Sequence, residues 1–242
     1  MRSIWTDEEV NPNDALWRYF RVDRLVSSLQ SGVLHFPSAR QFEDPFEGAV
    51  AVLAHDFPRD PRYPDFGHVD NAFEELRRLT KISCWHRADY ESAAMWKLYA
   101  AEGKGVAVRT TARRLQTALQ PFRLAPEYRE EEPYWGMVRY RDLHTERLRA
   151  SMEQRFFYKH RAFESEREFR VAFSVRIAEE FGVRVPDEGI DVAFLPDELI
   201  ESVYLGPALS VEDREAVVSA CASAGISGRF STSTLLGQPR YT

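Results

Sequence analysis

At 242 residues, of which 44% are hydrophobic and 13% aromatic, the chain is long and apolar enough to bury a sizeable core, which excludes a globally disordered protein. A formal net charge of −6 argues against general electrostatic binding to nucleic acid or anionic membranes, although 32 lysine and arginine residues leave room for a local basic groove. The two cysteines lack the paired spacing of a zinc or disulfide framework, and there is no signal peptide and no long apolar run, so we expect a cytoplasmic protein without a membrane-bound part.

Hydrophobic periodicity and turn signals predict strands and helices in an irregular order. In the first half, strands are predicted over 15–20, 33–36, 81–87 and 106–109, and helices over 22–30, 70–79, 92–101 and 110–119, with a proline-rich loop over 58–67. In the second half, strands are predicted over 134–140, 163–175, 183–186, 192–195 and 202–205, and helices over 145–157 and 211–224. The absence of a steady strand–helix alternation favours an α+β fold. We expect a single mixed-sheet domain over 1–242 with several packed helices, a motif-bearing core at about 15–206, and the helix 211–224 packed on it.

The most informative stretch is 163–170, Phe-Glu-Ser-Glu-Arg-Glu-Phe-Arg. In a strand, Glu164, Glu166, Glu168 and Arg170 share one face, because successive side chains alternate between the faces of a sheet. Three neighbouring carboxylates repel one another unless arginine or lysine neutralises them, a metal binds them, or one is retained for chemistry. The stretch is therefore either a solvated face paired to arginines or a functional site.

A second acidic segment lies at 37–48, where an Asp-Pro step stands between two phenylalanines. This pattern predicts a tight turn anchored by aromatic burial, which brings Glu43, Asp44 and Glu47 close together. Its acids either cap the next element or join a site, and Phe46 lies between them.

Four segments together resemble a bacterial family of unknown function. They are Arg-Tyr-Phe-Arg at 18–21, Ser-Ala-Arg-Gln-Phe-Glu-Asp-Pro-Phe-Glu at 38–47, Ile-Ser-Cys-Trp at 82–85 followed by Met-Trp-Lys-Leu-Tyr-Ala at 95–100, and the acidic stretch at 163–170. The chain departs from the family pattern at Glu43, where Asn is usual, at Trp85-His86 in place of Phe-Ser, and at Phe163 and Ser165. A weaker similarity, in the order of an early arginine strand, a middle strand before an aromatic helix, and a late Glu-x-Glu, is to ADP-ribosyltransferases.

The second resemblance implies an ADP-ribosyltransferase-like fold and an enzyme that uses NAD as its substrate, with no metal. It implies that Glu168 stabilises the oxocarbenium ion formed as nicotinamide leaves, and that Glu166 orients the acceptor, which is a protein, a nucleic acid or water. A carboxylate beside the developing positive charge lowers the barrier to this reaction. Residues of the early strand and the aromatic helix would bind NAD, with arginine on the pyrophosphate and an aromatic ring on nicotinamide; they are Arg18, Tyr19, Arg21, Trp96 and Tyr99. Further residues expected around the pocket are Asp44, Phe46, Glu47, Trp85 and Arg170. A bacterial toxin or anti-phage effector that transfers ADP-ribose or hydrolyses NAD would fit this reading.

Two other functions remain open. A metal-dependent nuclease could gather Asp44, Glu47, Glu166 and Glu168 around magnesium, with Lys159 or His86 assisting. The chain lacks the usual order for such an enzyme, because Lys159 precedes the glutamates. Alternatively, the glutamates only pair with arginines across a sheet, and the protein is a non-catalytic interaction module; the candidate partners are Arg18, Arg21, Arg109 and Arg170.

Overall fold

The computed structural model describes residues 1–7, 9–51 and 67–235, so the predicted loop at 58–67 lies almost wholly outside the described residues. The chain divides into two compact units, each assembled from three separate segments. The first unit comprises Met1–Glu9, His35–Cys84 and Pro121–Ile190, and the second comprises Val10–Leu34, Trp85–Gln120 and Asp191–Thr242. Three strands, β3 (Val33–Pro37), β4 (Thr80–Arg87) and β10 (Gly189–Ala193), contribute residues to both units.

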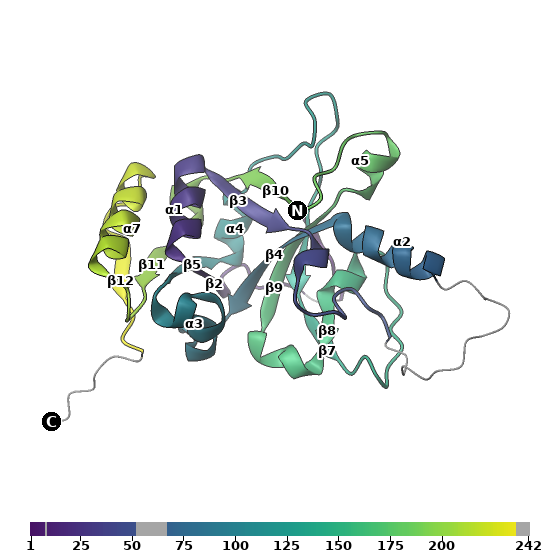
Figure 1. The fold of residues 1–242 in the computed structure, drawn as a ribbon, viewed down its shortest axis with the longest axis horizontal. Helices are drawn as coiled ribbons and strands as arrows, with labels where there is room; N and C mark the ends of the chain where they lie inside the picture. Colours follow the sequence, from purple (N-terminus) through teal and green to yellow (C-terminus); the bar gives the residue numbers. More distant parts are fainter. Residues whose placement is uncertain (8, 52–66, 236–242) are drawn as a thin grey trace. The chain divides into compact units, whose positions relative to one another are not determined.

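The second unit is built on a mixed sheet. Strand β2 (Ala15–Phe20) pairs antiparallel with β5 (Val106–Thr111) and with the end of β4; β5 pairs antiparallel with β11 (Ser202–Leu205), which runs parallel to β12 (Phe230–Thr232). Its helices are α1 (Val22–Ser31), α3 (Ala93–Tyr99), α4 (Ala112–Ala118), α6 (Pro196–Leu199), α7 (Val211–Ser223) and the 3-10 turn η2 (Ala101–Gly103). Helices α1 and α7 pack against each other (Figure 1).

Local capping signals set the helices of the second unit. Gly32 ends α1 in the left-handed conformation, at φ 67°, and the hydroxyl oxygens of Ser92 and Ser210 accept backbone N–H groups in the first turns of α3 and α7. The predicted helices at 22–30, 92–101, 110–119 and 211–224 are therefore confirmed to within a few residues at each end.

The first unit contains two sets of strands. Strand β6 (Tyr134–Met137) pairs parallel with β1 (Arg2–Ser3) and antiparallel with β9 (Glu168–Ser174), while β7 (Arg139–Arg141) and β8 (Tyr158–His160) form a separate parallel pair. Its other elements are η1 (Ala39–Gln41), α2 (Gly67–Arg78), η3 (Gln154–Phe157), η4 (Arg161–Glu166) and α5 (Arg176–Glu180). The mixture of strands in both directions with packed helices confirms the α+β class, while the single domain over 1–242 stays a prediction. No described helix has the length and apolar character needed to cross a bilayer.

Three predicted elements are wrong. The stretch 163–170 is not one strand: 161–166 forms η4, and the strand begins only at Glu168. The helix predicted at 145–157 is reduced to η3, because the backbone N–H of Leu148 donates to the carbonyl of Val50 and this tertiary contact overrides local helix propensity. The strand predicted at 183–186 has no regular structure.

A lysine is buried in the first unit. The side chain of Lys81 in β4 is fully buried, and its Nζ donates to Ser38 Oγ at 2.7 Å and to the carbonyl oxygen of Pro186 at 2.5 Å. Burial, reinforced by the positive charges of Arg78 and Arg40, lowers the pKa of Lys81 to about 8. The ammonium ion therefore costs free energy in the folded state at neutral pH.

This burial predicts a pH-dependent stability. Because Lys81 binds its proton more weakly when folded, stability should increase as pH rises from about 8 to the ordinary value of 10.5. We expect the free energy of unfolding of the wild type, minus that of Lys81→Met, to rise by up to about 3 kcal/mol over this interval. Urea unfolding at a series of pH values measures it, with Lys97→Met on the exposed side of α3 as the control. A difference that stays constant with pH would contradict the prediction.

Candidate functional site

The two predicted catalytic glutamates flank a turn between η4 and β9. Glu166 is the last residue of η4, and Glu168 is the first residue of β9. Arg167, between them, is left-handed at φ 42°, a conformation that is uncommon outside glycine, and its backbone N–H donates to the carbonyl of Glu164. Glu164 is exposed, so only two of the three acids enter the interior of the first unit.

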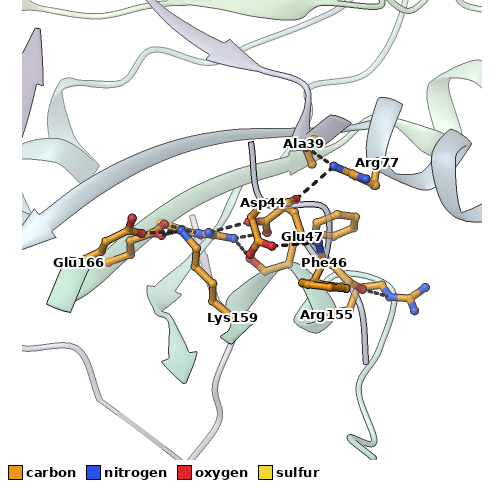
Figure 2. Close-up of polar contacts among 12 residues, drawn as sticks. Ala39, Asp44, Phe46, Glu47, Arg77, Arg155, Lys159 and Glu166 are labelled. Carbon is orange, nitrogen blue, oxygen red and sulfur yellow. Dashed lines mark hydrogen bonds and ion pairs between the residues drawn. The ribbon is translucent and has the colours of Figure 1, made fainter. Parts of the chain in front are cut away.

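Lys159 of β8 joins these two carboxylates. Its Nζ lies 2.5 Å from Glu166 Oε2 and 2.7 Å from Glu168 Oε1, so one ammonium group bridges both side chains (Figure 2). The backbone N–H of Glu168 donates to the hydroxyl of Tyr140 at 2.8 Å. Tyr140 and Lys159 are opposite each other in the parallel pair β7–β8, which therefore fixes both the backbone and the carboxylate of Glu168.

Arg170 connects Glu168 to the turn at 42–47. Its Nε lies 2.6 Å from Glu168 Oε2, and its two terminal nitrogens contact the two carboxylate oxygens of Glu47 at 2.5 and 3.0 Å. It also donates to the carbonyl of Phe156 at 2.6 Å, and its guanidinium lies 5.7 Å from the ring centre of Phe42. Arg170 is thus a fully buried cation whose donors are directed at two carboxylates and a carbonyl.

We call these five residues the charge cluster: Glu47, Lys159, Glu166, Glu168 and Arg170. Three carboxylates face two cations, which leaves one excess negative charge when every group is ionised. Burial is the main cause that raises the pKa of Glu166, and its hydrogen bond to Glu168 adds to the shift. Burial also opposes ionisation of Glu168, but the charges of Arg170 and Lys159 outweigh it and hold the pKa of Glu168 well below its usual range. A proton on Glu166 would make the cluster neutral.

Solvent reaches one end of the charge cluster. The side chains of Glu166 and Lys159 are 11% and 9% exposed and that of Glu168 is 7% exposed, whereas those of Arg170 and Glu47 are completely inaccessible. Burial raises the pKa of Glu47, against the opposing charge of Arg170. The end that includes Glu166 is therefore the part of the cluster that a ligand could contact.

The predicted turn at 42–47 is present and carries one unsatisfied oxygen, but its acids Asp44 and Glu47 are the buried residues, while Phe42 and Phe46 are half-buried and Glu43 is exposed. Asp44 Oδ1 accepts the backbone N–H of Phe46 at 2.9 Å. A terminal nitrogen of Arg77 donates to the backbone carbonyls of Asp44 and Ala39, at 3.5 Å in each case (Figure 2). Asp44 Oδ2 is buried and has no partner among the described residues. The half-buried ring of Phe46 contacts His144, with 5.8 Å between ring centres. Glu47 therefore joins the charge cluster, while Asp44 mainly holds the turn.

The predicted NAD-binding arginines lie in the second unit. Strand alternation places Arg18 on one face of β2, where its guanidinium lies 5.1 Å from the ring centre of Phe20 and 5.7 Å from that of Trp85. Arg21 precedes α1 and forms an exposed ion pair with Asp23 at 3.3 Å. Both side chains are charged and at least partly exposed.

The predicted aromatic residues belong to the opposite face of β2. Tyr19 packs edge-on against Trp96 with 5.2 Å between ring centres, and its hydroxyl accepts the backbone N–H of Ser92 at 2.7 Å. Trp96 is fully buried and donates from Nε1 to Glu91 at 2.8 Å, whereas Tyr99 is 50% exposed. Of these three rings, Tyr99 is thus the most exposed.

Two residues of the site are not predicted as site residues from the sequence. Tyr140 had no assigned role, and Lys159 was considered only as an assistant in the nuclease alternative. Tyr140 and Lys159 are brought together by the register of β7 and β8. These two strands are separated in the sequence by the irregular segment 142–153. No sequence pattern marks that pairing.

The described residues do not form a metal site: none of their His, Cys, Asp and Glu side chains gather in a group of three or more that could hold a metal ion. Asp44 does not enter the charge cluster, and the oxygens of Glu47 and Glu168 already contact Arg170 or Lys159. These contacts give the nuclease alternative no support from the described part of the chain.

Comparison with known proteins gives a partial match. A family model described as a protein of unknown function (DUF2971) matches residues 95–171, which confirms the resemblance to a family of unknown function over the aromatic helix and the acidic stretch. No curated protein matches the chain. Similar solved structures include DarT from Thermus sp. 2.9 in complex with ADP-ribosylated ssDNA, with 9% identity, a TM-score of 0.34, and coverage of 93% of this chain and 95% of that chain. DarT from the same source in complex with NAD+ gives 9% identity and a TM-score of 0.34, with coverage of 93% and 96%.

Proposed function

We propose that the protein cleaves NAD at the nicotinamide–ribose bond and transfers ADP-ribose to an acceptor or to water, with Glu168 and Glu166 as its catalytic residues. The observation that supports this proposal is the opposite shift in the pKa of two neighbouring carboxylates that share Lys159. Environments that push the pKa values of paired groups apart are typical of sites that need one ionised and one protonatable carboxylate.

The reaction needs both kinds of carboxylate. As the bond between the ribose carbon and the nicotinamide nitrogen breaks, the electron pair leaves with nicotinamide and positive charge develops on the ribose. Glu168, held ionised by Arg170 and Lys159, would stabilise that charge. A hydroxyl of the acceptor or a water molecule then bonds to the ribose carbon, and its proton passes to Glu166, whose raised pKa suits a general base.

For NAD binding, the resemblance alone assigns residues, and all of them belong to the second unit. Arg18 and Arg21 are the candidates for the pyrophosphate, and Tyr99, with its half-exposed ring, is the candidate for nicotinamide. Because Arg18 lies on the face of β2 opposite Tyr19 and Trp96, an NAD molecule on the aromatic face would use Arg21 in place of Arg18. Because the rings of Tyr19 and Trp96 are packed against each other, we propose that they hold α3 on β2 and do not contact NAD themselves.

The test compares two glutamates only two residues apart. Glu166→Gln resembles the protonated state of Glu166, so we expect it to fold normally and to lose nicotinamide release by about 100-fold or more. Glu164→Gln, on the exposed side of η4, is the matched control and should retain wild-type activity. Nicotinamide release from NAD is measured with water, protein and single-stranded DNA as acceptors. If the wild type releases none under any condition, or Glu166→Gln is fully active, the proposal fails.

A non-catalytic interaction module is the second candidate. The complete burial of the Arg170–Glu47 pair favours it, because a pair without access to solvent cannot contact a ligand, and breaking it would act on the fold alone. On this alternative, substitutions in the charge cluster would change stability alone, and titration with NAD would give no heat.

A further inference from the structure

His160 lies at the start of the short helix that ends in Glu166. It is the last residue of β8 and the N-cap of η4, where its Nδ1 accepts the backbone N–H of Ala162 at 3.2 Å. At the other end of η4, the backbone N–H of Arg167 donates to the carbonyl of Glu164. The cap at His160 and the carboxylate of Glu166 are thus the two ends of one six-residue element.

The cap depends on the protonation state of the imidazole. A ring nitrogen that accepts an N–H carries no proton, so the neutral ring has its hydrogen on Nε2. When the ring takes up a second proton, Nδ1 becomes a donor and cannot accept from Ala162. The first turn of η4 then loses its cap, which typically weakens the helix start about fivefold in its folding equilibrium. His160 can exchange protons with solvent, because its side chain is 21% exposed.

Charged or titratable groups of β7, of the segment that follows it and of η4 lie near His160. From the segment after β7, Asp142 Oδ1 lies 3.9 Å from Nε2, too long for a direct hydrogen bond, and the ring of His144 lies 5.4 Å away between centres. Arg161 of η4 pairs with Asp142 at 3.1 Å, and Arg141 is opposite His160 in β7. From η3, Arg155 donates to the carbonyl of Gly48. The nearest of these groups is Asp142, which meets the side of the ring away from Ala162.

We propose that His160 is a positioning residue that makes the placement of Glu166 depend on the proton of an imidazole. With the ring neutral, η4 is capped and Glu166 contacts Lys159. With the ring protonated, η4 loosens from its start and the contact between Glu166 and Lys159 weakens. This proposal deepens the proposed function, on which its catalytic consequence rests: NAD cleavage should decline as His160 takes up a proton.

The experiment uses two variants of the full chain. His160→Asn retains a cap acceptor that does not titrate, whereas His160→Ala removes the cap. Hydrogen exchange of the segment 161–166, corrected for intrinsic rates, is compared between about pH 5 and about pH 8. We expect protection in the wild type to fall about fivefold at the acid end, to stay constant in His160→Asn, and to be low at both pH values in His160→Ala. Thermal unfolding verifies that each variant is folded.

The pH profile of nicotinamide release is then recorded for the same three proteins. We expect His160→Asn to remain active at the acid end, where the wild type declines. If His160→Asn loses protection at acid pH as the wild type does, or if wild-type protection does not change with pH, the positioning role is wrong. If protection follows the expected pattern but no protein releases nicotinamide, the positioning role stands and the proposed function fails.

Discussion

Replacing Arg170 with methionine should lower the free energy of unfolding by about 3–5 kcal/mol. The substitution removes the cation that contacts Glu47 and Glu168 and leaves two buried carboxylates facing each other. It also leaves the carbonyl of Phe156 without its guanidinium donor. Since a domain is typically stable by only about 5–15 kcal/mol, this loss should be visible as a large drop in the urea midpoint and in the yield of folded protein.

A matched control separates burial from charge. Arg176→Met removes an arginine that also forms an ion pair, with Glu180, but both side chains are about half exposed. Its effect should remain below about 0.5 kcal/mol, because exposed pairs contribute little. Adding Glu47→Gln to Arg170→Met should recover part of the stability, since it neutralises one of the stranded carboxylates. Equal effects of Arg170→Met and Arg176→Met would show that the cluster is not buried in solution.

The parts of the fold that sequence predicted correctly are those with local signals. The helices at 92–101 and 211–224 begin at serines that cap them and carry apolar residues at helical spacing, so no distant contact is needed to place them. The stretch 163–170 was placed wrongly because its alternating acids imitate the two-residue period of a strand. Two features uncommon at these positions decide the outcome: a histidine as N-cap and an arginine in the left-handed conformation.

The candidate site was predictable in its residue types but not in its pairing. The crowding of acids at 163–170 marks Glu166 and Glu168 as candidates, and the resemblance to ADP-ribosyltransferases implies their catalytic role and, around them, Glu47 and Arg170 as pocket residues. That Arg170 binds the carboxylate of Glu47 could not be foreseen, since 123 positions separate the two residues and only tertiary packing brings them together. Arg18 and Tyr19 show why a motif does not define a binding surface. The two residues are adjacent in one strand, so their side chains belong to opposite faces of the sheet.

Replacing Lys159 with methionine should destabilise the protein by about 3 kcal/mol at neutral pH, and the loss should depend on pH. Without the ammonium group, the carboxylates of Glu166 and Glu168 are close together with only Arg170 to balance them. Repulsion then raises the pKa of Glu166 further above the unfolded-state value of 4.5.

The sign of the pH dependence follows from this shift. A carboxyl group with a raised pKa binds more protons when folded, so stability is lost as pH rises above about 4.5 and is regained as pH falls toward it. Glu168 has the opposite effect in the wild type: its lowered pKa adds stability above the same value, which is lost as pH falls below it. The difference in unfolding free energy between wild type and Lys159→Met should therefore already contain the Glu168 contribution near pH 4.5, grow further toward neutral pH as Glu166 ionises, and shrink as pH falls below about 4.5.

Urea unfolding at several pH values measures this difference, with the exposed Lys97→Met as a control that should show no such trend. The double variant Lys159→Met with Glu166→Gln should regain most of the stability at neutral pH, because it returns the cluster to the single excess negative charge of the wild type. If the double variant is as unstable as Lys159→Met alone, the loss does not come from the carboxylate balance, and the cation–π contact of Lys159 Nζ with the ring of Phe163, at 4.6 Å, becomes the main contribution of Lys159. If it recovers, the charge balance among Lys159, Glu166 and Glu168 holds the η4–β9 turn in place, and that balance sets the geometry of both proposed catalytic residues.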